Sequence, residues 1–327
     1  MTDHVTEPPR PLDPAGTARH RLAAYARLAK LDIYDYYLSI PLVWALLPAA
    51  HRWEPRVGAL LALTLLAQIA IAAAMVGFDD ITGFRDGSDA ANYGGDAARR
   101  RLIRKPLVAG TLTEAQALRF SWTAAAAGMA LWALVVAAAP YRPVWAVAGA
   151  AVCAVAAVQY SWGLKLSYHG FQEIFLIGLG VGWVLVPYGL LTGRADAAAI
   201  ASAVLFGAGP MLFGLYSNTV DVEGDRRAGR ITVATLVSAR GNAVFIVTMV
   251  AAMCLLIVGA PAAGALPWWF AVALLPALAM HAAHPVIAFG RGDVLRARYI
   301  AIRAHRVLAV LLVAAHLAAP RLAGVLP

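Results

Sequence analysis

Carboxylates gather in two short segments of an otherwise apolar chain. The first, residues 75–89, reads MVGFDDITGFRDGSD and contains Asp79, Asp80, Asp86 and Asp89. At about 100° per residue, a helix that continued through this segment would bring its carboxylates toward one face. Like charges at a membrane surface repel unless a cation lies among them. Mg²⁺ is the expected cation, because it takes hard oxygen ligands and commonly bridges carboxylates to the phosphates of a substrate.

The second segment lies further along the chain and reads SNTVDVEGDRRAGRIT. Asp221 and Asp225 are spaced i, i+4, so on a helix they face the same way and could hold a second Mg²⁺, with Asn218 one turn earlier. Arg226 and Arg230 follow closely. Carboxylates that bind metal ions, beside arginines that grip phosphate oxygens, form the arrangement expected for a diphosphate. For the first segment alone, a solvated loop of paired acids and arginines is the alternative.

The elements that must position these residues are membrane helices. Of the 327 residues, 61% are apolar and 14% are charged, and the mean hydropathy of +0.69 excludes a soluble globular enzyme. Nine apolar stretches are each long enough to cross about 30 Å of hydrocarbon as a helix. They are expected near 33–50, 56–78, 113–138, 143–162, 171–192, 196–218, 241–262, 267–289 and 302–319. The acidic segments follow the second and the sixth stretch.

Basic residues are distributed unevenly between the two sides of such a bundle. With nine spans, 21 Lys and Arg residues fall on the side of the N-terminus and five on the other. The positive-inside rule therefore places the N-terminus and both acidic segments in the cytoplasm. The cations form short clusters between apolar runs, so the formal charge of +9 indicates topology and anionic ligands and not nucleic acid.

The chain is expected to have two parts. Residues 1–30 are polar and rich in proline near their start, which predicts a tail leading into a surface helix and not a signal peptide. Residues 31–327 are expected to form a single transmembrane domain. Cys153 and Cys254 lie inside apolar runs far apart in the sequence, which fits neither a disulfide framework nor a thiolate metal site.

Taken together, these motifs resemble the UbiA superfamily of intramembrane prenyltransferases. The second acidic segment is similar to the DxxxD motif of the family. RKPLVAGTLTEAQAL (104–118) is similar to its RPLxSGxLS segment, and YARLAKLD (25–32) resembles its N-terminal helix entry. The resemblance covers nearly the whole chain. It implies an all-α integral membrane protein, with nine transmembrane helices in a bundle and with active-site loops on the cytoplasmic side.

The first acidic segment departs from the family pattern NDxxDxxxD. Aligning Asp80 with the second position of this motif puts Gly83 and Gly87 where carboxylates are usual. Asp86 and Asp89 flank the vacant last position, and either could substitute after a small helix shift. The resemblance therefore implies these metal ligands: Asp79, Asp80, Asp86, Asp89, Asp221 and Asp225.

A third similar element is YSWGLKLSYHG (160–170). Tyr160 and Lys165 are separated by four residues, whereas many family members have three between their tyrosine and lysine. Lys165 is the only cation of its loop, which suits a diphosphate ligand, and the ring face of Tyr160 suits a carbocation. Anchoring at the membrane interface is the alternative for both residues.

The resemblance also implies the reaction, which is Mg²⁺-dependent transfer of a prenyl group to an aromatic or other lipid-soluble acceptor through an allylic carbocation. Catalytic roles are implied for Asp80, Tyr160, Lys165, Asp221 and Asp225. Binding of the diphosphate is implied for Arg104, Lys105, Lys165, Asn218, Arg226 and Arg230. The expected partners are a prenyl diphosphate, a small acceptor and membrane lipid.

Three other functions fit parts of the pattern. A terpene cyclase of the same fold would trap the cation with the double bonds of the substrate itself, and the unusual first motif leaves room for it. An ion-coupled transporter would place its acids in mid-helix, not at helix ends beside arginines. A CDP-alcohol phosphotransferase needs a dense DxxDGxxAR motif, which this sequence lacks.

Overall fold

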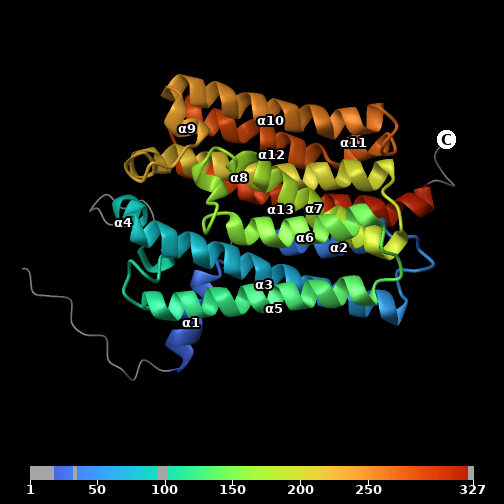
Figure 1. The fold of residues 1–327 in the computed structure, drawn as a ribbon. Coiled ribbons are helices and arrows are strands. Elements are labelled where there is room, and N and C mark those ends of the chain that lie inside the picture. The colour runs from blue at the N-terminus through green and yellow to red at the C-terminus, as the bar shows by residue number, and fades with distance from the viewer. Residues whose placement is uncertain (1–17, 32–34, 94–101, 323–327) are drawn as a thin grey trace, which may run out of the picture.

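Long helices that run side by side make up the protein. The computed structural model describes residues 18–31, 35–93 and 102–322. Figure 1 shows the helices lying nearly parallel in one bundle, with the short helices α4 and α9 at the same end. Over the described residues, the structure is helical apart from turns, loops and one isolated bridge between His169 and Ile231. The expectation of an all-α protein is confirmed.

Six helices in the described ranges are long and apolar enough to cross a membrane. They are α3 (Pro55–Arg85), α5 (Glu114–Ala138), α7 (Gln172–Thr192), α8 (Ala197–Arg227), α10 (Ala239–Ala262) and α13 (Val294–Leu322). In hydrocarbon a helix satisfies its own backbone groups, so this set indicates a multi-pass membrane protein.

The three other expected spans also contain helices, but shorter ones. They are α2 (Ser39–Leu46), which follows the 3₁₀ turn η1 (Asp35–Leu38), then α6 (Val144–Gln159), and α12 (Leu275–Pro285), which lies between α11 (Trp269–Ala273) and the π-helical turn η4 (Val286–Gly290). Pro276 has no backbone N–H to donate in the first turn of α12, which separates that helix from α11. The count of nine spans stays a prediction.

Short elements connect these helices. They are α1 (Ala18–Leu28), α4 (Ser88–Tyr93), α9 (Val233–Leu236), and the 3₁₀ turns η2 (Leu102–Arg104) and η3 (Leu166–Tyr168). The helix predicted near the N-terminus is α1, in which Leu28 packs into a cluster with Phe78 of α3. The predicted tail over residues 1–17 lies outside the described residues. Because α1 rests on α3, it brings Lys30 to the end of the bundle.

Helices α7 and α8 approach each other through glycine. A Cβ added to Gly180 would lie 2.6 Å from Gly207 Cα, and one added to Gly207 would lie 2.7 Å from the Ile177 carbonyl oxygen. Two backbones can come this close only where no side chain intervenes. The contact holds the end of α8 beside the start of α7, where Gln172 Nε2 donates to Asn218 Oδ1 at 3.0 Å.

An ion pair between a buried carboxylate and a partly exposed arginine joins η1 to the last helix. The side chain of Asp35 is 0% exposed, and its two oxygens accept from Arg306 Nε at 2.5 Å and from Arg306 Nη2 at 3.0 Å. A carboxylate removed from water is stable only with a partner of this kind. The pair therefore fixes the start of α2 against α13.

We expect Gly207→Ala to destabilise the protein by about 1–3 kcal/mol, because the added methyl group would push the backbones of α7 and α8 apart. Gly178→Ala is the matched control, since a Cβ at Gly178 on the same pair of helices meets no atom within 4 Å. The measurement is the thermal unfolding midpoint of the detergent-solubilised protein. Equal midpoints for the two variants would contradict the close approach of these helices.

Candidate active site

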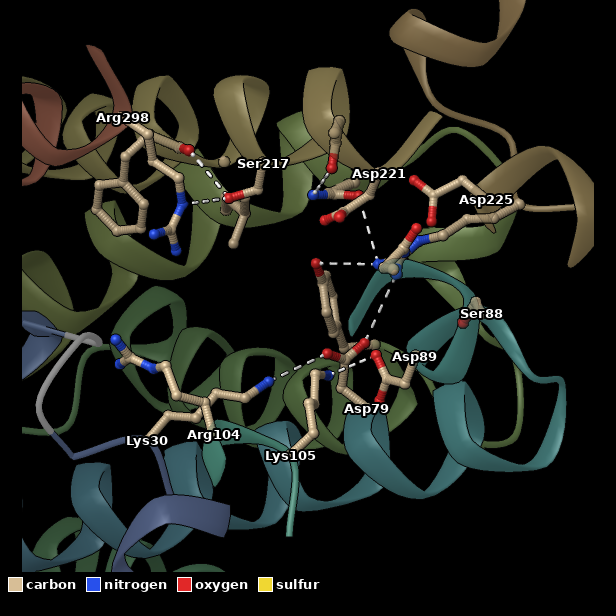
Figure 2. A pocket seen from close by; sticks show the side chains of 18 of the residues that line it. Lys30, Asp79, Ser88, Asp89, Arg104, Lys105, Ser217, Asp221, Asp225 and Arg298 are labelled. Atoms are coloured by element: carbon tan, nitrogen blue, oxygen red, sulfur yellow. Dashed lines mark hydrogen bonds and ion pairs between the residues drawn. The ribbon is translucent and has the colours of Figure 1, made fainter. Parts of the chain in front are cut away.

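A polar pocket of about 130 Å³ lies at the end of the bundle where α3 and α8 finish (Figure 2). Its side chains come from α3, α4, α7, α8, α13 and the loops between them. The charged residues that line it are Lys30, Asp79, Asp89, Arg104, Lys105, Asp221, Asp225, Arg230 and Arg298. Four carboxylates and five cations thus face one small space.

The first acidic segment folds back on itself at this end of α3. The helix finishes at Arg85, and Gly87, with a φ of 78°, turns the chain into α4. Asp89 in the first turn of α4 then returns to Gly83, so closely that a Cβ on Gly83 would lie 2.8 Å from the Asp89 carboxylate carbon. The sequence analysis considered a helix that continued through the whole segment. The helix ends before Asp89 instead, and a turn brings this residue to the same pocket.

Two lysines lie against these carboxylates. Asp80 is 1% exposed, and its Oδ1 lies 2.8 Å from the Nζ atoms of both Lys30 and Lys105. Lys105 Nζ is also 2.7 Å from Asp89 Oδ1, and Lys30 Nζ is 3.5 Å from Asp79 Oδ2. Among the described residues, Asp80 Oδ2 and Asp89 Oδ2 are buried without a hydrogen-bond partner. Each of these two carboxylates therefore keeps one oxygen for a further ligand.

Asp86 and Lys165 lie away from this pocket. The Tyr168 hydroxyl donates to Asp86 Oδ2 at 2.5 Å, and the Ser88 backbone N–H donates to Asp86 Oδ1 at 3.0 Å. Lys165 is exposed, and its Nζ lies 5.3 Å from the centre of the Tyr168 ring. Both residues line a neighbouring hollow. Neither residue is among those that line the pocket with Asp79. The metal-binding role predicted for Asp86 and the catalytic and diphosphate-binding roles predicted for Lys165 stay predictions.

The second acidic segment forms the last turns of α8. Asn218, Asp221 and Asp225 all line the pocket, in keeping with their helical spacing. Asp225 is buried, and Asn218 Nδ2 is buried with no hydrogen-bond partner in the described part of the chain. Helix α4 packs against this end of α8 at Gly224, where any side chain would run into Asn92. The two acidic segments therefore meet through α4.

Arg230 follows the second acidic segment in the sequence and contacts the first one at Asp79. The chain turns at Gly229, with a φ of 69°, and returns the guanidinium toward α3. Its Nη1 is 3.8 Å from Asp79 Oδ1, and its Nη2 donates to the Tyr160 hydroxyl and to Gln172 Oε1, each at 3.5 Å. Tyr160 is buried and lines the pocket. Arg230 thus connects three helices at the centre of the site.

Two cations of the pocket, Lys105 and Arg230, remain charged. Burial alone would lower the pKa of Lys105, but the carboxylates of Asp80 and Asp89 outweigh it and raise that pKa well above its usual value. For Arg230, burial is again outweighed, here by the negative charges around the guanidinium, and its pKa is also raised. Burial raises the pKa of Asp89 to about 6, against the opposing charge of Lys105. An anionic ligand would therefore meet fixed positive charge near neutral pH.

The lining residues that were not singled out from the sequence as site residues include Lys30, Gln172, Ser217 and Arg298. Arg298 of α13 donates from Nε to Ser217 Oγ at 2.6 Å, on the side of the pocket away from Asp225 (Figure 2). Lys30 lies in the N-terminal segment that resembles the family's helix entry, and this resemblance could have identified it as a site residue. Arg298 was visible only as one basic residue among many on the same side.

The two acidic segments differ in how well they fit a metal ion. Within the described residues, no group of three or more Asp, Glu, His or Cys side chains is arranged to hold one. Mg²⁺ often uses one or two carboxylates and completes its shell with water and phosphate oxygens, so Asp221 and Asp225 fit such a site. Asp80 and Asp89 fit less well, because the Lys105 ammonium already lies 2.8 and 2.7 Å from their oxygens.

The sequence profile of the UbiA prenyltransferase family matches residues 38–319. No curated protein matches the chain.

Solved structures with a similar fold include two UbiA homologs and a digeranylgeranylglyceryl phosphate synthase. A UbiA homolog from Aeropyrum pernix K1 has a TM-score of 0.61 and 16% identity, over 86% of this chain and 98% of that one. A UbiA homolog from Archaeoglobus fulgidus bound to GPP and Mg²⁺ has a TM-score of 0.62 and 14% identity, over 90% and 98%. A digeranylgeranylglyceryl phosphate synthase has a TM-score of 0.60 and 11% identity, over 91% and 99%. At these identities the likeness shows the fold.

We expect Arg230→Gln to weaken the binding of inorganic pyrophosphate about tenfold, because a charge-assisted hydrogen bond at the centre of the pocket is lost. Arg226, which the resemblance implied as a diphosphate ligand, is exposed and is not among the described residues that line the pocket, so Arg226→Gln is the control. Isothermal titration of the purified protein measures both affinities. An equal loss in the two variants would mean that Arg230 has no special access to the ligand.

Proposed function

Because the chain belongs to the UbiA prenyltransferase family, we propose that it transfers a prenyl group from a prenyl diphosphate to an aromatic or other lipid-soluble acceptor inside the membrane. The observation that carries this proposal is the pocket in which four carboxylates and five cations meet at the end of an apolar helix bundle. A prenyl diphosphate has the matching chemistry, with a charged head and an apolar tail. The similar protein from Archaeoglobus fulgidus binds such a molecule, GPP, together with Mg²⁺.

The diphosphate head is proposed to bind next to Arg230. This guanidinium is held by Tyr160, Gln172 and Asp79 before the ligand arrives. Binding therefore costs less side-chain conformational entropy. The amide nitrogen of Asn218 has no partner within the described residues and supplies a further donor. These groups would fix the phosphate oxygens and leave the allylic carbon at the apolar side of the pocket.

Asp221 and Asp225 are the residues proposed to hold Mg²⁺. The bound ion would stabilise the negative charge that develops on the pyrophosphate as the allylic C–O bond breaks. Both carboxylates project from one face of α8, which lets them share a ligand. Asp225 is held by a turn in which its own carbonyl accepts from the Arg230 backbone N–H at 2.8 Å. The turn therefore fixes the backbone of Arg230 relative to that of Asp225.

The apolar wall of the pocket is proposed to protect the carbocation. Leu176, Pro210 and Phe213 line the pocket on α7 and α8, and apolar walls exclude water that would quench the cation. Tyr160 presents a ring to the same space and packs on Phe175 with ring centres 4.8 Å apart. An aromatic face beside a cation is stabilising. The acceptor would then capture the cation before water does.

A terpene cyclase of the same fold is the second candidate, favoured by the lysine-bound first acidic segment. Both reactions begin with ionisation of the diphosphate, so the pocket alone does not separate them. Purified protein supplied with Mg²⁺ and prenyl diphosphates of ten to twenty carbons separates them through its products. A prenylated acceptor that forms only when an aromatic compound is added supports the transferase, and a cyclic hydrocarbon or alcohol formed without acceptor supports the cyclase.

The orientation in the membrane is part of the proposal. The pocket lies at the end of the bundle that carries most of the basic residues, so the positive-inside rule favours a cytoplasmic pocket and N-terminus. In a protein with Cys153 and Cys254 changed to Ala, we expect Arg291→Cys to react with impermeant reagents from the cytoplasmic side only. Ala195→Cys, at the other end, should react from the opposite side only. The reverse labelling would overturn this topology.

Turnover of a prenyl diphosphate should stop in EDTA and return with Mg²⁺. Asp221→Asn and Asp225→Asn should each lower turnover at least about a hundredfold, because a neutral amide compensates the metal charge poorly. Glu223→Gln is the matched control on the same turns of α8, since Glu223 is exposed and pairs with Arg227 at 2.9 Å. The measurement is release of pyrophosphate. Full activity in chelator, or equal loss in Glu223→Gln, would refute the metal role of this segment.

A further inference from the structure

A lysine lies where a metal ion would bridge the first acidic segment. Lys105 Nζ is 2.8 Å from Asp80 Oδ1 and 2.7 Å from Asp89 Oδ1, and the Lys105 side chain is only 8% exposed. Building on the function proposed above, we propose that the Lys105 ammonium takes the place of one metal ion, so that the enzyme binds Mg²⁺ only at Asp221 and Asp225.

The backbone is shaped for this bridge. Gly87 adopts a φ of 78°, which lets α4 turn back, and the lack of a side chain on Gly83 leaves room for the Asp89 carboxylate. A carboxylate carried by residue 83 would occupy the space that Asp89 now fills. The two glycines that depart from the usual acidic motif are therefore the two that allow Asp89 to meet Lys105.

Lys105 is held in place from several sides. Its backbone N–H donates to the Leu102 carbonyl at 2.9 Å, which closes η2, and Pro106 restricts the chain immediately after it. The ring of Tyr93, at the end of α4, lies 5.6 Å from the ammonium nitrogen. The same helix thus supplies Asp89 and an aromatic contact, and the ammonium is ordered before any substrate binds.

Three of the four carboxylates of the first segment are compensated without a metal ion. Three carboxylates pair with three cations, and these are Asp79, Asp80, Asp89, Lys30, Lys105 and Arg230. A divalent ion entering this cluster would lie beside ammonium groups in a space with little water, where repulsion between like charges is strong. A covalently attached cation, in contrast, is always present and needs no free metal.

Two carboxylate oxygens could hold a metal ion in place of the arrangement proposed here. Asp80 Oδ2 and Asp89 Oδ2 are buried and lack hydrogen-bond partners among the described residues, so a metal ion held by these atoms is the alternative that an experiment must detect. If Lys105 replaces the ion, removing the ammonium should open a metal site between Asp80 and Asp89. If the ion binds beside Lys105, the number of bound ions should not rise when the lysine is removed.

The test counts Mn²⁺, a paramagnetic substitute for Mg²⁺, bound to the purified full-length protein by electron paramagnetic resonance. The titration is run with and without a prenyl thiolodiphosphate, whose C–S bond resists ionisation. With this ligand, we expect one Mn²⁺ per chain for the natural protein and two for Lys105→Ala. Lys105→Arg, which keeps the charge, should bind one, and so should Arg291→Ala, which removes an exposed cation outside the pocket.

Two ions bound by the natural protein, or an unchanged count in Lys105→Ala, would overturn the inference. Should Lys105→Ala fail to fold, Asp80→Asn decides the question, because the count stays at one if Asp80 pairs only with lysine and falls by one if Asp80 binds metal. Failure of the proposed function would look different. The chain would then bind no thiolodiphosphate and form no product, while the Mn²⁺ count without ligand would still show whether removing Lys105 adds one ion.

Discussion

Mutual compensation of buried charges is the constraint on which the active end of this protein depends. Carboxylates at the ends of apolar helices cannot rely on bulk water, so each needs a cation within a few ångströms. Lys30 arrives from α1, Lys105 from the loop before α5, and Arg230 from the turn after α8. Elements far apart in the sequence are therefore held together by the same cluster that we propose binds the diphosphate. The site is at once a binding surface and a structural junction.

Close backbone contacts make that junction possible. Gly180 and Gly207 let α7 and α8 touch, and Gly224 lets α4 rest on α8. These contacts set the positions of the helices that carry the polar groups of the pocket. The distances between those groups therefore depend on close packing of helices with little side-chain volume between them. In a bilayer, where lipid is as apolar as the helix surface, packing of this kind supplies much of the association energy.

Local spacing in the sequence predicted the α8 part of the site, because one continuous helix carries Asn218, Asp221 and Asp225. The first segment was less predictable, since the turn at Gly87 that redirects Asp89 depends on tertiary packing and leaves no periodic signal. Arg298 could not be found at all, because its role comes from the position of α13 in space. Spans interrupted by proline or by 3₁₀ turns were likewise predicted as uniform helices from hydropathy alone.

The ion pair between Asp35 and Arg306 has a consequence for folding of the chain during translation. The two residues are separated by 271 positions, so the carboxylate near the first helix leaves the ribosome long before its partner is synthesised. N-terminal segments generally fold first during translation. The nascent chain must therefore keep Asp35 at a hydrated boundary, or shield it by other means, until α13 arrives. Closure of the bundle is then a late event in biogenesis, and truncation before α13 would leave the Asp35 carboxylate without its arginine partner.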